Sequence, residues 1–214
     1  MSGRLRWHSL GEVSVSDEPT VFLVDDERSV LASLRALVKA VFPRVECFRS
    51  ARGFLDAYTA DRPGCLVLDV LMPEMDGLQL QQYLLQQGIQ LPIVFFTGHA
   101  DVKMAVQAMQ AGAVDFLQKP CPEQRLWESI RRALAQDERD RQNASRRARV
   151  NDRLNSLKDG ERAVLELICE GLTNKQIAHR LDRSLRTIED RRGKVMKKVE
   201  AASVAQLMRM VLDS

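Results

Sequence analysis

Residues 21–27, VFLVDDE, and residues 66–77, LVLDVLMPEMDG, decide the fold of the first part of this 214-residue chain. Each stretch opens with a short apolar run that ends in acid, at Asp25 in the first and at Asp69 in the second. Apolar runs of four to eight residues bounded by polar residues are typical of strands buried on both faces, as in parallel sheets. We therefore expect two strands of a parallel sheet, each with a carboxylate at its carboxyl end.

Three more apolar runs extend this pattern, and helical segments separate them. Strands are expected at 45–48, 93–96 and 113–117, and helices at 30–41, 77–88 and 99–110. Strands that alternate with helices form parallel sheets covered on both faces, joined by right-handed crossovers. The stretch from Pro19 to about Leu134 thus predicts an α/β doubly wound, flavodoxin-like domain with a five-stranded parallel sheet.

Reactive side chains follow the expected strands. Asp25, Asp26 and Glu27 follow the first, Asp69 the third, Thr97 the fourth and Lys119 the fifth. Carboxyl ends of parallel strands meet at one edge, so these groups are predicted to share a crevice. Clustered carboxylates repel unless a cation joins them, and Mg²⁺ prefers oxygen ligands. One carboxylate can then attack phosphorus while the metal and Lys119 neutralise charge. Alone, Asp26 or Glu27 would be interpreted as a helix cap; the four strand ends together favour the site.

Four segments at these strand ends resemble the receiver domain of two-component response regulators. They are Val21–Glu27, Leu66–Gly77, Phe95–His99 and Asp115–Pro120. All four occur in order, and the resemblance covers roughly residues 19–135. It implies that Asp69 accepts a phosphoryl group from a sensor histidine kinase.

The same resemblance implies roles for the other residues of the pocket. The implied Mg²⁺ ligands are Asp25, Asp26, Asp69 and the backbone carbonyl of Leu71. Lys119 is expected to pair with the phosphoryl group, and Thr97 to hydrogen-bond it. Phe116 stands where the family has a switch aromatic, which turns inward when Thr97 moves. A plain core aromatic remains compatible with this role, because the inward rotamer is buried.

After Trp127 the composition changes to that of a linker. Residues 128–153 are rich in Arg, Asp, Gln and Ala and contain no Gly or Pro. Apolar residues leave a gap between Leu134 and Val150 that is too long for a sustained heptad, so a solvated helical linker is favoured over a coiled coil. The expected organisation is a flexible lead-in at 1–18, a receiver at 19–135, a helical, charged linker at 136–153 and an all-α domain at 154–214.

From Leu157 onward every pattern is helical. A stripe from Ala163 to Ile168 ends at Gly171, and Thr173 begins a capping box for a second short helix. Ser184 is the expected N-cap of a long helix to about Glu200, and a last helix holds the apolar residues between 204 and 212. Consecutive short helices with a tight turn before the long one suggest a helix-turn-helix.

The segments Glu161–Ala178 and Ser184–Met196 resemble the LuxR-type effector domain, and the two halves together resemble the NarL/FixJ class of response regulators. The resemblance implies that residues 185–200 form the recognition helix for double-stranded DNA. Glu189, Asp190 and Gly193 are expected to face base edges, and Thr187, Arg192, Lys194 and Lys198 to face phosphates. Arg191 and Lys197 complete the expected DNA-binding set, whose basic charge suits phosphate contacts.

This chain departs from the family pattern at several positions. Gly193 inside the recognition helix costs ~1 kcal/mol relative to alanine. Arg191 stands where relatives usually have histidine, and Lys158 replaces a capping threonine, for which Asp159 is the expected substitute. Asp190 requires a cytosine amino donor, or else it repels the DNA backbone.

Charge and composition agree with two different halves. Residues 1–127 contain 12 Lys and Arg against 15 Asp and Glu, whereas 128–150 and 151–214 each have a net charge of +3. An acidic front and a basic back suggest a cation site and a nucleic-acid partner. The four cysteines show no metal or disulfide spacing. No apolar run approaches the ~20 residues that span a bilayer, and residues 1–18 lack a signal-peptide core, so a cytoplasmic protein without membrane contact is expected.

These observations predict a phosphorylation-controlled transcription factor that is not an enzyme and that dimerises through its receiver and effector domains on activation. Two alternatives stay open. A haloacid-dehalogenase-like phosphohydrolase would carry a second aspartate two residues after the nucleophile, where this chain has Leu71. An interaction protein would use its receiver for docking and bind DNA independently of phosphate.

Overall fold

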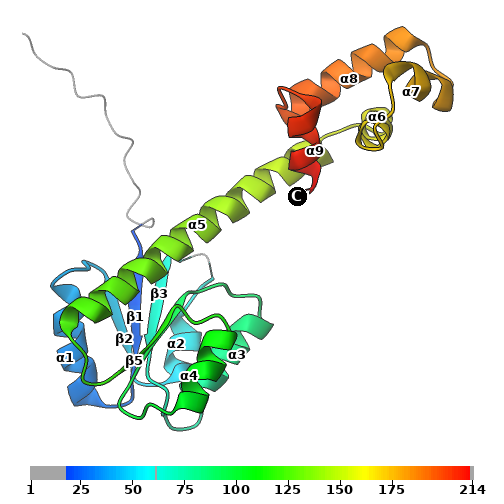
Figure 1. Cartoon of the computed structure of the whole chain (residues 1–214). Coiled ribbons are helices and arrows are strands. Elements are labelled where there is room, and N and C mark those ends of the chain that lie inside the picture. Colours follow the sequence, from blue (N-terminus) through cyan, green and yellow to red (C-terminus); the bar gives the residue numbers. More distant parts are fainter. Residues whose placement is uncertain (1–17, 61, 213–214) are drawn as a thin grey trace, which may run out of the picture. The chain divides into compact units, whose positions relative to one another are not determined.

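The computed structural model describes residues 18–60 and 62–212, and the chain divides near residue 140 into two compact units. The first unit contains a five-stranded sheet flanked by helices, and the second contains helices α6 to α9 (Figure 1). Helix α5 (Glu123–Asn155) crosses the boundary between the units in sequence. Of the predicted lead-in, only Glu18 lies in the described part, where it forms an ion pair with Arg44.

All strands of the sheet are parallel, in the order β2-β1-β3-β4-β5. They are β1 (Thr20–Val24), β2 (Val45–Phe48), β3 (Gly64–Leu68), β4 (Ile93–Thr97) and β5 (Asp115–Gln118). Every residue of β1 and β3 is buried, because these strands lie inside the sheet with helices on both faces. The doubly wound, five-stranded prediction is confirmed.

Two apolar cores hold the helices against the sheet. Helices α1 (Arg28–Lys39) and α5 cover one face through residues such as Leu34 and Ile130. Helices α2 (Ala51–Ala57), α3 (Gly77–Gln86) and α4 (Val102–Gln110) cover the other face through residues such as Phe54, Leu80 and Ala108. The helices divide between the two faces because the strand order reverses direction next to β1, and right-handed crossovers then place their helices on opposite faces.

Two element boundaries differ from the sequence-based expectation. Strand β5 begins at Asp115 rather than at residue 113, because the Ala113 amide bonds back to the Ala108 carbonyl and closes the end of α4. Helix α4 begins at Val102 rather than at residue 99, because the Asp101 side chain caps it by accepting from the Lys103 amide at 3.2 Å. In both cases a cap at one end of α4 makes the element begin later than the apolar pattern predicts.

The second unit is all-α, as predicted. Its helices are α6 (Asp159–Cys169), α7 (Asn174–Arg180), α8 (Leu185–Val199) and α9 (Val204–Leu212). Thr173 forms the expected capping box of α7, and Ser184 caps α8. The expectation that Asp159 caps α6 is wrong: Lys158 is the N-cap residue, and its amide donates to the Glu161 carboxylate at 2.9 Å.

Helix α5 is continuous through the predicted linker, residues 136–153. Within the first unit it is anchored by Asp137, whose buried carboxylate accepts from the Gly64 amide at 2.9 Å. The domain limits at 135 and 153 stay predictions, since no break in the helix marks either one. Across residues 18–60 and 62–212, none of the helices combines the length and apolarity that crossing a bilayer needs.

Candidate functional site

The carboxyl ends of β1, β3 and β5 bring two aspartates and a lysine together. Val24 pairs with Leu68 in the sheet, so Asp25 and Asp69 follow neighbouring strands at the same level. The Lys119 ammonium lies between them, with Nζ at 2.6 Å from Asp25 Oδ2 and at 3.0 Å from Asp69 Oδ1. Asp25 is 3% exposed and Asp69 is 8% exposed, so this ion-pair cluster is largely removed from water.

Burial and charge set the protonation of this cluster. Burial raises the pKa of the Asp69 carboxyl above its usual value, while Lys119 and the Thr97 hydroxyl oppose that rise. Burial alone would lower the pKa of the Lys119 ammonium, but its hydrogen bonds to Asp25 and Asp69 raise that pKa overall. Lys119 is therefore charged at neutral pH and holds a carboxylate that is more basic than an exposed one, which suits a nucleophile.

A glycine allows α3 to begin directly against Asp69. A Cβ atom on Gly77 would lie 2.2 Å from the Asp69 carbonyl oxygen, so no larger residue fits there. The Gly77 amide also donates to the Val70 carbonyl at 2.8 Å. Asp76 and Gly77 thus close the loop after β3, with Asp76 as the N-cap of α3.

Thr97 and Phe116 occupy the neighbouring strands β4 and β5. Thr97 is fully buried at the end of β4, and its Oγ1 accepts from the His99 amide at 3.3 Å. The Lys119 amide donates to the Thr97 carbonyl at 2.8 Å, which ties the two strand ends together. The Phe116 ring is half-buried, with its centroid 5.8 Å from that of Phe95. The predicted switch residues therefore lie on the two strands that adjoin the pocket.

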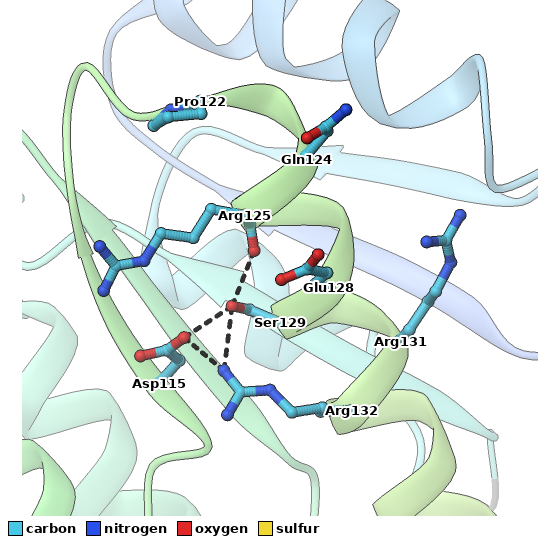
Figure 2. Close-up of a pocket in the computed structure, with 8 residues that line it drawn as sticks. All are labelled: Asp115, Pro122, Gln124, Arg125, Glu128, Ser129, Arg131 and Arg132. Carbon is cyan, nitrogen blue, oxygen red and sulfur yellow. Dashed lines mark hydrogen bonds and ion pairs between the residues drawn. The ribbon is translucent and has the colours of Figure 1, made fainter.

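The residue before Phe116 anchors β5 to α5. Figure 2 shows Asp115 bonded to Ser129 and Arg132, and all three residues line one pocket. Asp115 Oδ2 accepts from Ser129 Oγ at 2.6 Å and from Arg132 Nη2 at 2.5 Å, and Oδ1 accepts from the Phe116 amide at 2.9 Å. This network was not predicted from sequence, because it joins residues 14 and 17 positions apart on different elements.

The predicted metal ligands differ in how far they are buried. Asp25 and Asp69 are buried, Asp26 directly follows Asp25 and is half-buried, and Leu71 is exposed two residues after Asp69. Over the described ranges, no three His, Cys, Asp or Glu side chains group closely enough to form a complete protein ligand set. Mg²⁺ at phosphoryl-transfer sites uses only one or two carboxylates together with water and phosphate oxygens. The two buried carboxylates on one edge fit that requirement.

Helix α8 of the second unit presents one polar face. Ile188, Val195 and Val199 are buried against the unit's core. The opposite face, at spacings of three and four residues, consists of Arg186, Glu189, Asp190, Gly193, Lys194 and Lys197, all exposed. Five of these six are in the predicted DNA-binding set, and Arg186 is the one that it omitted. Arg186 lies three residues before Glu189 and seven before Gly193, and this helical spacing could have placed it on the same face from sequence.

The remaining predicted DNA-binding residues have partners inside the unit. Arg192 donates to Asn174 Oδ1 at 2.6 Å, and Lys198 Nζ lies 2.6 Å from the buried Glu161 carboxylate. The Arg191 guanidinium lies against Gly160, and the Thr187 hydroxyl pairs with that of Ser184 at 2.8 Å. Each of these four is half-buried. They flank the exposed face and brace α8 against α6, α7 and its own N-cap.

Comparison with known proteins finds relatives for both units of the chain. Residues 21–131 match the family model described as response regulator receiver domain, and residues 155–211 match bacterial regulatory proteins, luxR family. The response regulator protein TmoT of Ectopseudomonas mendocina is 41% identical over 202 residues, 94% of this chain and 92% of TmoT. The transcriptional regulatory protein FixJ of Bradyrhizobium diazoefficiens is 39% identical, over 90% of this chain and 94% of FixJ. The low-resolution structure of response regulator StyR superposes with a TM-score of 0.81 at 40% identity, covering 92% of this chain and 100% of StyR.

Proposed function

Because this chain belongs to the response regulators of the NarL/FixJ class, in which a receiver precedes a LuxR-type DNA-binding domain, we propose that it is a transcription factor switched by phosphorylation of Asp69. The family is one of transcription regulators rather than of enzymes. The phosphohydrolase alternative is therefore set aside. Leu71, where such an enzyme would need its general acid, agrees with this.

One observation supports the phosphorylation step above all others: a single ammonium group contacts both buried aspartates. An Asp69 oxygen attacks the phosphorus of a phosphohistidine on the sensor kinase; the O–P bond forms, the N–P bond breaks and the imidazole leaves. Lys119 already points at Asp69 and would neutralise the incoming phosphoryl oxygens. Burial excludes water from this charge pair and strengthens it.

Asp25, Asp26, Asp69 and the Leu71 carbonyl would hold Mg²⁺ in this pocket. When bound, the ion supplies positive charge to the phosphoryl oxygens. The Glu27 amide donates to Asp25 Oδ1 at 2.9 Å, so Asp25 is oriented toward the pocket by the backbone that follows it. Its second oxygen contacts Lys119.

Phosphorylation would act by a population shift. The added charge can be bound by Lys119 and the Thr97 hydroxyl in one conformer only, which draws Thr97 toward Asp69. Phe116 then fills the space that Thr97 leaves. Because Phe116 lies on β5, this change reaches the face formed by α4, β5 and α5, where we propose that the receivers dimerise.

Helix α8 would enter the major groove of double-stranded DNA. Its exposed face carries Arg186, Lys194 and Lys197, which suit phosphates and guanine, and Glu189, which accepts from base amino groups. Paired effector domains, joined through α9, would bind an inverted repeat. Such a factor, fed by a sensor kinase, would work in the cytoplasm, where the DNA is.

The first test is the intact mass after incubation with acetyl phosphate and Mg²⁺. A single phosphoryl adduct is expected on the wild type and none on Asp69→Ala or in the presence of a chelator. DNA affinity is then compared before and after phosphorylation. Equal affinity of wild type and Asp69→Ala under phosphorylating conditions would instead favour a protein that binds DNA independently of phosphate.

A further inference from the structure

Gly193 lies in the middle of α8, where glycine is an unfavourable choice. Glycine lowers the stability of a helix interior because it loses the most backbone freedom on folding. Its φ is not in the left-handed region, so the backbone does not demand glycine here. Some other property of the site must explain the residue.

Packing within the domain does not explain it either. A Cβ atom built on Gly193 would meet nothing within 4 Å, so an alanine fits freely. Gly64 and Gly77 are different, because a Cβ there would lie 2.0 and 2.2 Å from backbone oxygens. Among these three, only Gly193 is free of any steric requirement from its own chain, and it faces solvent.

The neighbours of Gly193 turn the missing side chain into a defined gap. Glu189 and Lys197 lie four residues before and after it, on the same row of the helix and about 6 Å away on each side. Both are exposed. On the adjacent row, Lys194 Nζ bends back to Asp190 Oδ2 at 2.6 Å, so its charged end is directed along the helix beside the gap. The exposed face thus presents a carboxylate, an apolar notch and an ammonium in line.

We propose that this notch, the surface over the Gly193 Cα between Glu189 and Lys197, receives the C5-methyl group of a thymine, and that Gly193 is a specificity-determining residue. The inference rests on the proposed DNA-binding function of α8. The thymine methyl is the hydrocarbon group that projects into the major groove, and it distinguishes A·T from G·C there. A side chain at position 193 would occupy the space of that methyl group and hold the helix away from the bases.

The test begins with the phosphorylated full-length protein, which selects its preferred duplex from a randomised double-stranded DNA library. Each thymine of the selected site is then replaced, one at a time, by deoxyuridine, which lacks only the methyl group. Affinities are measured for wild type, Gly193→Ala and Gly193→Leu. Glu166→Ala, at an exposed position of α6, is the control. Amide hydrogen exchange in α8 reports helix stability separately.

The proposal predicts opposite changes in stability and binding. Gly193→Ala should slow exchange in α8 by roughly fivefold, because alanine favours the helix. It should also weaken binding to the selected site on the order of tenfold, and Gly193→Leu should weaken it more. Deoxyuridine at one position should weaken wild-type binding and restore most of the affinity of Gly193→Ala. The control should change neither the selected site nor the effect of deoxyuridine.

Three results would overturn the proposal. If Gly193→Ala binds the selected DNA as tightly as the wild type does, the notch is empty in the complex. An equal loss with and without every thymine methyl would mean that Gly193 provides flexibility and no base contact. If wild type selects no sequence while Gly193→Ala still shows slower exchange in α8, the proposed DNA-binding function itself fails, and the notch with it.

Discussion

At the scale of single residues, the pocket is organised around a conflict between burial and charge at Asp69. Burial raises the pKa of this carboxyl, so the ionised form is less favourable in the fold than in water. Lys119 and Thr97 offset part of the cost without removing it, since the net shift is upward. A buried carboxylate held in this way is a local source of instability, which the proposed role of Asp69 as phosphoryl acceptor would explain.

This conflict predicts a stability gain for Asp69→Asn, which mimics the neutral carboxyl. A carboxyl with a raised folded pKa loses stability as pH rises through that pKa, so the gain should be present at pH 7 and shrink as pH falls toward 4. Thermal unfolding in a chelator should show a midpoint higher by a few degrees, on the order expected for ~1 kcal/mol. Asp56→Asn, at an exposed acid, is the control and should show no such gain. An unchanged or lower midpoint for Asp69→Asn at pH 7 would contradict this account.

At the scale of elements, α4 is the most loosely held helix of the sheet's second face. Ala108 is its one fully buried residue, whereas Val102, Val106 and Met109 are exposed. A buried glutamine on α3 supplies what apolar packing does not. Gln81 Nε2 donates to the Ala108 carbonyl at 3.1 Å and to the Ala111 carbonyl at 3.3 Å. These carbonyls lie at the C-terminal end of α4, where the Ala108 carbonyl also accepts from the Ala113 amide, so Gln81 reinforces the closure of that helix end.

Replacing this anchor should loosen one end of one helix. Gln81→Leu keeps the volume but removes both hydrogen bonds, and it should destabilise the last turn of α4 by about 1 kcal/mol. Amide exchange at residues 111–113 should quicken roughly fivefold, while phosphoryl uptake from acetyl phosphate stays unchanged. Gln82→Leu, at the next and exposed position of α3, is the matched control. Equal exchange in the two variants would show that α4 does not depend on Gln81.

At the scale of the whole molecule, the proposed function requires that phosphorylation of Asp69 alter DNA binding by the second unit. Val102, Val106 and Met109 form an exposed apolar stripe along α4, on the face that we propose for the phosphorylated receiver dimer. In this proposal, dimerisation would raise DNA affinity by linking two effector domains, without any new contact to the bases. The two steps can be separated experimentally, since chemistry at Asp69 involves none of these apolar residues.

Val106→Asp places a charge on this stripe and should block the dimer without disturbing phosphorylation. We expect normal phosphoryl uptake, at least a tenfold weaker phosphorylation-dependent dimer by analytical ultracentrifugation, and a matching loss of affinity for a two-site duplex. Ala36→Asp, on the exposed side of α1, should behave as wild type. A phosphorylated Val106→Asp protein that dimerises normally would exclude α4 from the interface.

Sequence by itself determined the sheet and its reactive edge, because both follow from local patterns combined with one topological rule. The apolar run before Asp69 is long enough for a strand and too short for a helix, and parallel strand ends must meet at one edge. The caps at Thr173 and Ser184 were predictable for the same reason, since each involves residues three positions apart.

Only the tertiary structure decided which charged side chains are exposed and which are paired. Arg192 and Lys198 appear in sequence as two more basic residues of α8, yet Asn174 and Glu161, 18 and 37 positions away, hold them. The same holds for Asp115 with Ser129 and for Gln81 with α4. Helical periodicity places a residue on a face, but the packing of a second element determines whether that face meets solvent or a partner.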